Sequence, residues 1–188
     1  MGKDKSIKFL LIFCFLLLAF KIFAVYKTVL GLHGDEAQYW TWSKDLSWGY
    51  FSKPPLIAFL IKIFTAIFGN SIFAIKLFPV IFYVFTSIAV YFLGKIIFDK
   101  KIGLISGITF FLLPGVSLSS FLISTDVPLL FFWSLALYFS YKQINNPNIV
   151  SALFLGISIG VGFLAKYAMV YYFVCTVFFA FLDRSFFI

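Results

Sequence analysis

The chain has 188 residues, of which 63% are hydrophobic and only 12% are charged, and its mean hydropathy is +1.06. So little polar material cannot cover a water-soluble domain, and the composition predicts a protein embedded in a bilayer. The formal net charge of +8 occurs without a basic run interleaved with polar residues, which argues against nucleic acid and favours membrane lipid headgroups or a phosphate-bearing substrate as partners.

A helix needs about 20 mainly apolar residues to cross the hydrocarbon core of a membrane, or somewhat fewer where its ends are shielded. Six runs are candidate crossings, at residues 9–29, 72–98, 103–121, 123–141, 150–166 and 168–183. The first run outlasts a signal-peptide core and no small-residue cleavage site follows it, so we expect a retained helix. Gly156 and Gly160 have the spacing of a small-residue pair that lets helices approach closely, with Gly162 nearby.

Residues 56–68 are apolar but span only 13 positions and contain Lys62, which favours a helix lying at the membrane surface. If this segment lies flat, the loops that carry Asp35, Lys53, Asp126 and Lys166 emerge on one side of the membrane. If it spans, the bilayer separates Asp35 from Asp126 and Lys166. We expect the flat arrangement, and hence an all-helical, multi-pass bundle forming one membrane domain over residues 1–188, with surface helices in a first external loop at 31–72.

That loop concentrates polar and charged residues between two apolar blocks. Asp35 and Glu36, both candidate catalytic residues, fall in the first turn of a predicted short helix, where the helix dipole stabilises carboxylates. Asp35, Tyr39 and Trp42 share one face of it, at spacings of four and seven residues. Such a face suits a lipid-borne sugar, since rings stack on sugars and a carboxylate accepts a proton. Alternatively, the acids only begin a surface helix that tryptophans anchor.

Lys53 precedes Pro54 and Pro55, which stop any helix from running through. A lysine at this place can hold the phosphate of a lipid-linked donor, or can serve as an ordinary headgroup anchor. Asp126 begins a helix after Ser124 and Thr125, where a carboxylate is either a capping accessory or a group facing a polar cavity.

Lys166 and Tyr167 lie at the end of the fifth candidate crossing. They are candidates for a second cationic contact to the substrate, the alternative being a lysine that snorkels to the surface. His33 is the only histidine and does not predict a metal, because a catalytic zinc normally takes three protein ligands. No cofactor follows from the residues, and a divalent metal, although possible, has no support among them.

Three segments together resemble the superfamily of protein O-mannosyltransferases and aminoarabinose transferases, which are membrane glycosyltransferases of the GT-C fold. They are GDEAQYWTWSKDLSWGYFSKPPLIAFLIKIFTAIFGNSIFAIKLFPV, STDVPLLFFWSLALYF and GVGFLAKYAM. The resemblance covers residues 9 to 183 and implies a sugar donor linked to polyprenyl phosphate. It also implies a protein, lipid or glycan acceptor, and transfer with inversion at the anomeric carbon. Family members are several hundred residues long, so the chain is expected to correspond to the amino-terminal part.

In that superfamily the aspartate of the acidic pair acts as base, a lysine before the prolines contacts the donor phosphate, and a second-loop aspartate joins the site. These positions match Asp35, Lys53 and Asp126. A glutamate that helps to bind metal in the aminoarabinose transferases is replaced here by Ser52, so no metal is carried over. The expected location is a bacterial inner membrane, with the active site on its external, periplasmic face.

Two other functions stay open on the sequence alone. The chain could be a non-catalytic fragment or partner subunit that keeps the fold. It could also be a small transporter or lipid flippase, in which Asp35 and Asp126 would be polar sites within the membrane.

Overall fold

Every regular element in residues 5–27 and 31–182, the parts of the chain that the computed structural model describes, is a helix. The elements are α1 (Lys5–Lys27), α2 (Gly34–Trp42), α3 (Leu56–Phe68), α4 (Ile72–Ile97), α5 (Lys100–Leu112), α6 (Pro114–Ser119), α7 (Asp126–Asn145), α8 (Ile149–Ala165), the 3-10 turn η1 (Tyr167–Met169) and α9 (Val170–Leu182). The all-helical prediction is confirmed.

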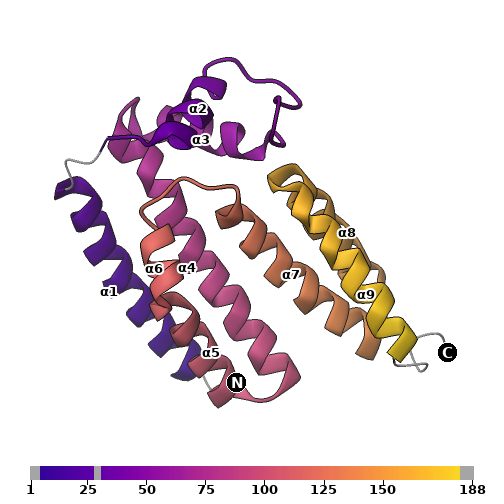
Figure 1. Cartoon of the computed structure of the whole chain (residues 1–188). Coiled ribbons are helices and arrows are strands. Elements are labelled where there is room, and N and C mark those ends of the chain that lie inside the picture. Colours follow the sequence, from indigo (N-terminus) through magenta and orange to yellow (C-terminus); the bar gives the residue numbers. More distant parts are fainter. Residues whose placement is uncertain (1–4, 28–30, 183–188) are drawn as a thin grey trace.

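The longer helices run side by side in alternating directions, and α2 and α3 lie across one end of them (Figure 1). The beginning of α1 and the end of α9 are both at the opposite end of the bundle (Figure 1). This agrees with the interpretation of residues 56–68 as a surface helix rather than a crossing.

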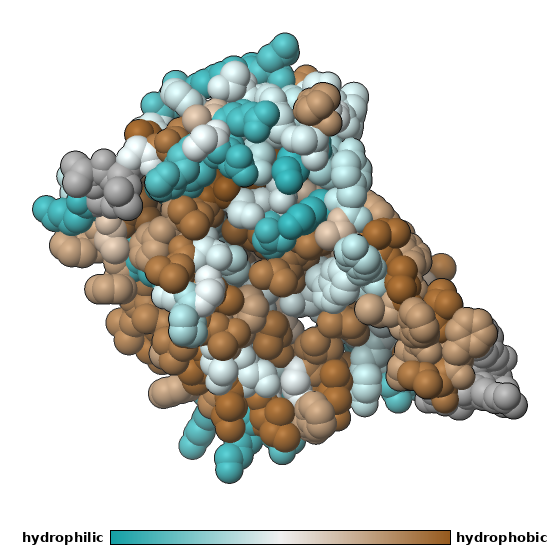
Figure 2. Space-filling model, in the orientation of Figure 1, coloured by the Kyte–Doolittle hydropathy of each residue, from teal (hydrophilic) through white to brown (hydrophobic). Residues whose placement is uncertain are grey.

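Helix α4 is the centre of the packing, with contacts to α1, α3, α5 and α7. Its Phe78 and Tyr83 belong to the larger buried cluster, together with Leu10 of α1 and Ile57 of α3. Large hydrophobic side chains such as Phe15 and Leu182 are exposed on the outside of the bundle. Figure 2 shows them as a brown belt between two hydrophilic ends, the pattern of a bundle that meets lipid.

Two of the described helices, α1 and α4, are long and apolar enough to cross a membrane by themselves. Three stretches are apolar but shorter: Leu56–Phe68, Ile149–Ala165 and Tyr167–Leu182. The chain is therefore a membrane helical bundle.

The single helix predicted over 103–121 is wrong, because α5 ends at Leu112 and α6 begins at Pro114. Leu113 between them is extended, with φ −52° and ψ 130°. Proline has no backbone N–H and disfavours a helical conformation in the residue before it, so the helix stops there and restarts with Pro114 in its first turn.

Lys21 of α1 holds the end of the short helix α6 from inside the bundle. Its ammonium donates to the Ser117 carbonyl at 3.2 Å, to Ser117 Oγ at 3.1 Å and to Ser120 Oγ at 2.7 Å. All three ammonium hydrogens therefore have acceptors, and the cation lies where a helix C-terminus is electronegative.

Helices α4 and α5 approach each other closely at glycines, but these are not Gly156 and Gly160. A Cβ on Gly103 would lie 2.6 Å from the Tyr91 carbonyl oxygen, and one on Gly107 would lie 3.0 Å from that of Ser87. These contacts join α5 to α4. Nothing lies within 4 Å of a Cβ placed on Gly156 or Gly160, so the predicted close contact there is absent from the described part of the chain, whereas Gly162 does pack against Met169.

Candidate active site

Helix α2 begins at the end of the bundle where the loop between α6 and α7 also lies (Figure 1). His33 precedes the helix in an extended conformation, and its backbone N–H donates to Glu36 Oε2 at 2.9 Å. The side chain of the third helical residue thus reaches back and satisfies a donor at the helix start. This arrangement turns Glu36 inward and leaves Asp35 on the outer side of the first turn.

Glu36 is a brace between segments that are distant in the chain. Its Oε1 accepts a hydrogen bond from the Ile123 backbone N–H at 2.8 Å, and its Oε2 lies 3.6 Å from Lys76 Nζ. Both charged side chains are only 3% exposed. Because its oxygens already have partners and no solvent reaches them, the surroundings of Glu36 fit a bracing role better than the catalytic role expected from the sequence.

Lys76 is the residue that sequence reasoning missed. It lies in the buried part of α4, and its ammonium also donates to the Phe121 carbonyl at 3.4 Å. The available signal was a lysine inside an apolar helix, because a charge at that depth needs a partner. Glu36 and Lys76 together tie α2, α4 and the loop before α7 into one unit.

Asp35 is exposed and has no hydrogen bond or ion pair with any other described residue. Its negative charge nevertheless affects the pKa of Tyr39. The pKa of the Tyr39 phenol is raised above its ordinary value, first by burial and then by the negative charges of Asp35 and Asp126. Asp35 and Asp126, which are remote in the sequence, therefore lie in one neighbourhood around Tyr39.

Asp126 begins α7 and forms an ion pair with Lys166 at the end of α8, with 2.6 Å between Oδ1 and Nζ. Ser124 Oγ donates to the second carboxylate oxygen at 3.1 Å and accepts from the Asp126 backbone N–H at 3.2 Å. Both charged groups are partly exposed, so this pair is open to a ligand. Tyr167 follows in η1 and is exposed.

Tyr39 and Trp42 of α2 pack against each other, and Trp42 also packs against Tyr50 of the following loop. Tyr39 is 4% exposed, and its ring centre lies 5.5 Å from that of Trp42. Trp42 stacks on Tyr50 with 4.5 Å between ring centres, and the Tyr50 hydroxyl donates to the Trp42 carbonyl at 3.0 Å. One face of Trp42 is thus occupied, so the expected stacking of a sugar is limited to the ring surface left open.

The Lys53 backbone carbonyl accepts from the Tyr50 N–H at 3.2 Å. Within residues 5–27 and 31–182 its ammonium has no hydrogen bond or ion pair, so the structure does not join it to the acids. Nor do those residues contain a group of three or more histidine, cysteine, aspartate or glutamate side chains that could hold a metal ion.

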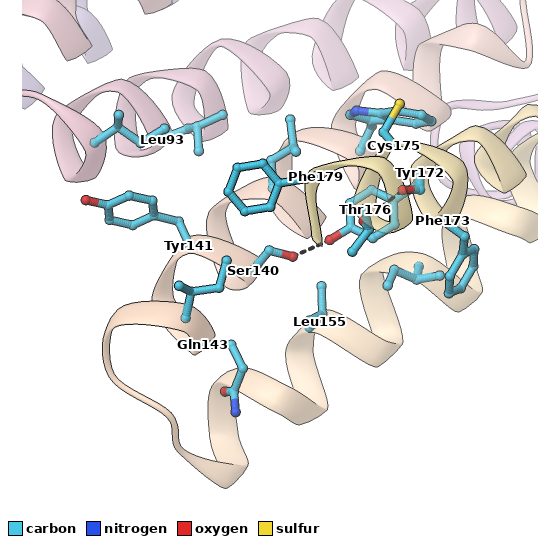
Figure 3. A pocket seen from close by; sticks show the side chains of 15 residues that line it. Leu93, Ser140, Tyr141, Gln143, Leu155, Tyr172, Phe173, Cys175, Thr176 and Phe179 are labelled. Atoms are coloured by element: carbon cyan, nitrogen blue, oxygen red, sulfur yellow. Dashed lines mark hydrogen bonds between the residues drawn. The ribbon is translucent and has the colours of Figure 1, made fainter. Parts of the chain in front are cut away.

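A large apolar cavity is separate from these residues. It measures about 710 Å³ and opens between α4, α7, α8 and α9. Apolar side chains such as Leu93, Leu155 and Phe179 line it, and the Ser140 and Tyr172 hydroxyls hydrogen-bond to each other within it (Figure 3). No lysine, aspartate or glutamate lines this cavity, so it is suited to hydrocarbon rather than to acid–base chemistry.

The profile of the dolichyl-phosphate-mannose-protein mannosyltransferase family matches residues 52–187. The match includes Lys53, Asp126, Lys166 and Tyr167 but begins after α2. Lipid A galacturonosyltransferase RgtD of Rhizobium johnstonii is 39% identical over 138 residues, which are 73% of this chain and 29% of that protein.

The chain therefore spans less than a third of that relative's length. No solved structure matches the chain. Both the matched profile and the named relative are glycosyltransferases, and the bundle with its surface helices has the architecture expected of such membrane enzymes. The chain belongs to the dolichyl-phosphate-mannose-protein mannosyltransferase family of GT-C-type membrane glycosyltransferases.

Proposed function

We propose that this chain carries the acid–base centre of a glycosyl transfer from a polyprenyl-phosphate-linked sugar to a hydroxyl of an acceptor at the membrane surface. The observation that carries the proposal is that the negative charges of Asp35 and Asp126 both raise the pKa of Tyr39, at the end of the bundle covered by α2 and α3. Both carboxylates are exposed, but Asp35, unlike Asp126, has no hydrogen bond or ion pair among the described residues, which leaves its oxygens open to an acceptor hydroxyl.

In this mechanism Asp35 removes the proton from the acceptor hydroxyl. The acceptor oxygen then forms a bond to the anomeric carbon while the bond from that carbon to the phosphate oxygen breaks. The electron pair of the broken bond goes to the phosphate, and attack from the opposite face inverts the anomeric centre. Lys53 and Lys166 stabilise the departing phosphate, and Asp126 orients the Lys166 ammonium through their 2.6 Å ion pair.

The nature of the substrates is inferred from the relatives. The family description names dolichyl-phosphate mannose, which supports a lipid-phosphate donor. The relative is named as a lipid A galacturonosyltransferase, which supports a glycolipid acceptor. We propose accordingly that the chain has six crossings in the inner membrane of a bacterium, with α2 and α3 on the external face.

Replacing Asp35 with asparagine tests the proposal. The variant keeps the shape of the side chain but cannot accept a proton, so transfer from a labelled polyprenyl-phosphate sugar should fall by about 10²–10⁴-fold, the usual contribution of a general base. The measurement is labelled product formed by membranes that contain the protein and a lipid acceptor fraction.

Asp45→Asn is the matched control, because Asp45 is another exposed aspartate of the same loop. It should retain transfer and insert in the membrane to the same level. Full transfer activity of Asp35→Asn would contradict the assignment of Asp35 as the general base. Movement of labelled lipid across the membrane without any covalent product would instead identify a transporter or flippase.

A further inference from the structure

Another cavity, which is polar, lies between the end of α2 and the second half of α3. It measures about 280 Å³ and is lined by Ser43, Lys44, Lys62, Thr65, Ala66 and Asn70. Its volume is near the lower end of ligand pockets, which run from about 300 to 1,000 Å³. None of the residues assigned above to the acid–base centre lines it.

The hydrogen-bonding groups left unused in this cavity are donors. Lys44 Nζ donates to Asn70 Oδ1 at 2.7 Å, which leaves two ammonium hydrogens on Lys44 and both amide hydrogens on Asn70. The Lys62 carbonyl accepts from Thr65 Oγ1 at 3.1 Å, but its ammonium has no hydrogen bond or ion pair with the other described residues, so all three ammonium hydrogens are available. A molecule that completes this set must supply acceptor oxygens.

The hydroxyl hydrogens of the cavity are already committed to backbone carbonyls. Ser43 Oγ donates to the Trp40 carbonyl at 2.6 Å, and Thr65 Oγ1 donates to the Ile61 carbonyl at 2.9 Å. The two hydroxyls therefore fix the cavity wall, and the ligand chemistry is left to the two lysines and the asparagine amide.

The charges of the lining point to an anion. Two lysines line one small space, and no aspartate or glutamate lines it. Like charges that share a site repel each other, and an anion between them converts the repulsion into two attractive contacts. A phosphate group provides both the charge and the acceptor oxygens that the cavity lacks.

The neighbourhood of Lys62 indicates a membrane source for that phosphate. Ile63, Ile67 and Phe68 of α3 are exposed beside it, although they are large hydrophobic side chains. A surface helix with apolar residues next to a lysine lies at the depth of lipid headgroups, with its apolar side towards the acyl chains.

We propose that Lys44, Lys62 and Asn70 bind the phosphate of an anionic lipid headgroup in this cavity. The site is distinct from the candidate active site, because Asp35 lies at the start of α2 whereas Lys44 follows its end, and no residue of the acid–base centre lines the cavity. The bound lipid anchors the α2–α3 layer to the membrane surface, whichever reaction the chain supports.

The experiment measures binding of a fluorescent phosphatidic acid to the full chain in a neutral detergent. The double variant K44Q/K62Q should bind at least tenfold more weakly, since each lysine contributes about a fivefold gain next to an anionic headgroup. K44R/K62R keeps both charges and should bind as the unaltered chain does. Phosphatidylcholine, whose headgroup has no net charge, should fail to displace the probe.

K8Q/K101Q is the matched control, because it removes two exposed lysines outside the cavity and lowers the net charge equally. If K8Q/K101Q weakened lipid binding as much as K44Q/K62Q does, the effect would be one of overall charge, and the proposed binding site would be overturned. Displacement by inorganic phosphate at the concentration of the lipid would overturn its assignment to a lipid headgroup. Asp35→Asn should bind the lipid normally, so failure of the proposed reaction leaves this test intact.

Discussion

The two neighbouring carboxylates of α2 differ in what surrounds them. Asp35 faces outward with no partner among the described residues, while Glu36 is buried against Lys76 and the Ile123 N–H. A buried charge is stable only when it is paired and hydrogen-bonded, so the role of Glu36 is to hold α2 in place.

Glu36→Gln should therefore destabilise the protein rather than disable the reaction selectively. The change leaves the Lys76 ammonium buried without a counter-charge, which costs about 3–5 kcal/mol in comparable pairs. Thermal unfolding in detergent should show a clearly lower midpoint than for Asp35→Asn, whose side chain is exposed.

The double variant Glu36→Gln/Lys76→Met supplies the control for that experiment. It removes the uncompensated cation, so its unfolding midpoint should lie above that of Glu36→Gln. A double variant no more stable than the single one would contradict the proposed role of the Glu36–Lys76 pair in holding α2 in place.

Tyr39 provides a pH test of the same neighbourhood. Its pKa is raised in the folded protein by burial and by the charges of Asp35 and Asp126, so the folded state holds the phenolic proton more tightly than the unfolded state does. Stability from this residue is complete below the unfolded pKa of about 10 and is lost as the pH rises through the higher folded value.

Tyr39→Phe should accordingly lose less stability than the unaltered chain as the pH rises above about 10. Unfolding midpoints measured across that range provide the check, and the lysines titrate in both proteins. Parallel curves for the two proteins would show that the phenol is not held in its protonated form.

At the scale of elements, the contact between α4 and α5 depends on glycine. A methyl group at Gly103 would meet the Tyr91 carbonyl oxygen and the Lys95 backbone nitrogen, at 2.6 and 2.8 Å. Backbone atoms cannot turn aside as side chains do, so Gly103→Ala should force the helices apart at a cost of about 1–3 kcal/mol.

Gly156→Ala is the matched substitution in α8. Nothing lies within 4 Å of the added methyl group, and alanine favours a helix over glycine by about 1 kcal/mol. Unfolding midpoints should therefore fall for Gly103→Ala and hold or rise for Gly156→Ala. The reverse order would contradict the packing of α4 against α5.

Some of this arrangement could be predicted from the sequence, since a polar residue in an apolar chain is conspicuous. The short helix α3 over residues 56–68 could be predicted from its 13 apolar positions, and Lys62, Asp35 and Asp126 stood out as charges in an apolar chain. Which polar residues pair with each other could not be predicted in that way. The partner of Glu36 depends on how α2 lies on α4, and Ile123 is 87 residues away.

Pro114 and the glycines show the same limit within elements. The proline was visible, yet whether it bends a helix or ends it depends on what satisfies the freed backbone groups, and here the Phe110 carbonyl accepts from the Leu113 N–H at 3.3 Å. Gly156 and Gly160 have the spacing of a packing motif, but the spacing does not say whether a neighbouring helix is present.

At the scale of the whole molecule, the candidate site requires Asp35 and Asp126 on one side of the membrane. Cysteines placed singly at 35 and 126, after removal of Cys14 and Cys175, should react with an impermeant maleimide from the same face of a sealed vesicle. A cysteine at Lys101, near the opposite end of the bundle, should react from the other face. Labelling of positions 35 and 126 from different faces would rule out a shared site.

The contact between Lys21 and α6 also has a consequence in time. Lys21 is made 96 residues before Ser117, which accepts its hydrogen bonds. At about 5–20 residues per second, the ribosome takes roughly 5 to 20 seconds to add that stretch. During that interval the ammonium has no acceptor from α6 and must stay near the headgroups, which its long side chain can reach from the last turns of α1. Helix α1 therefore gains its contacts to α6 only after residues up to Ser120 have been synthesised.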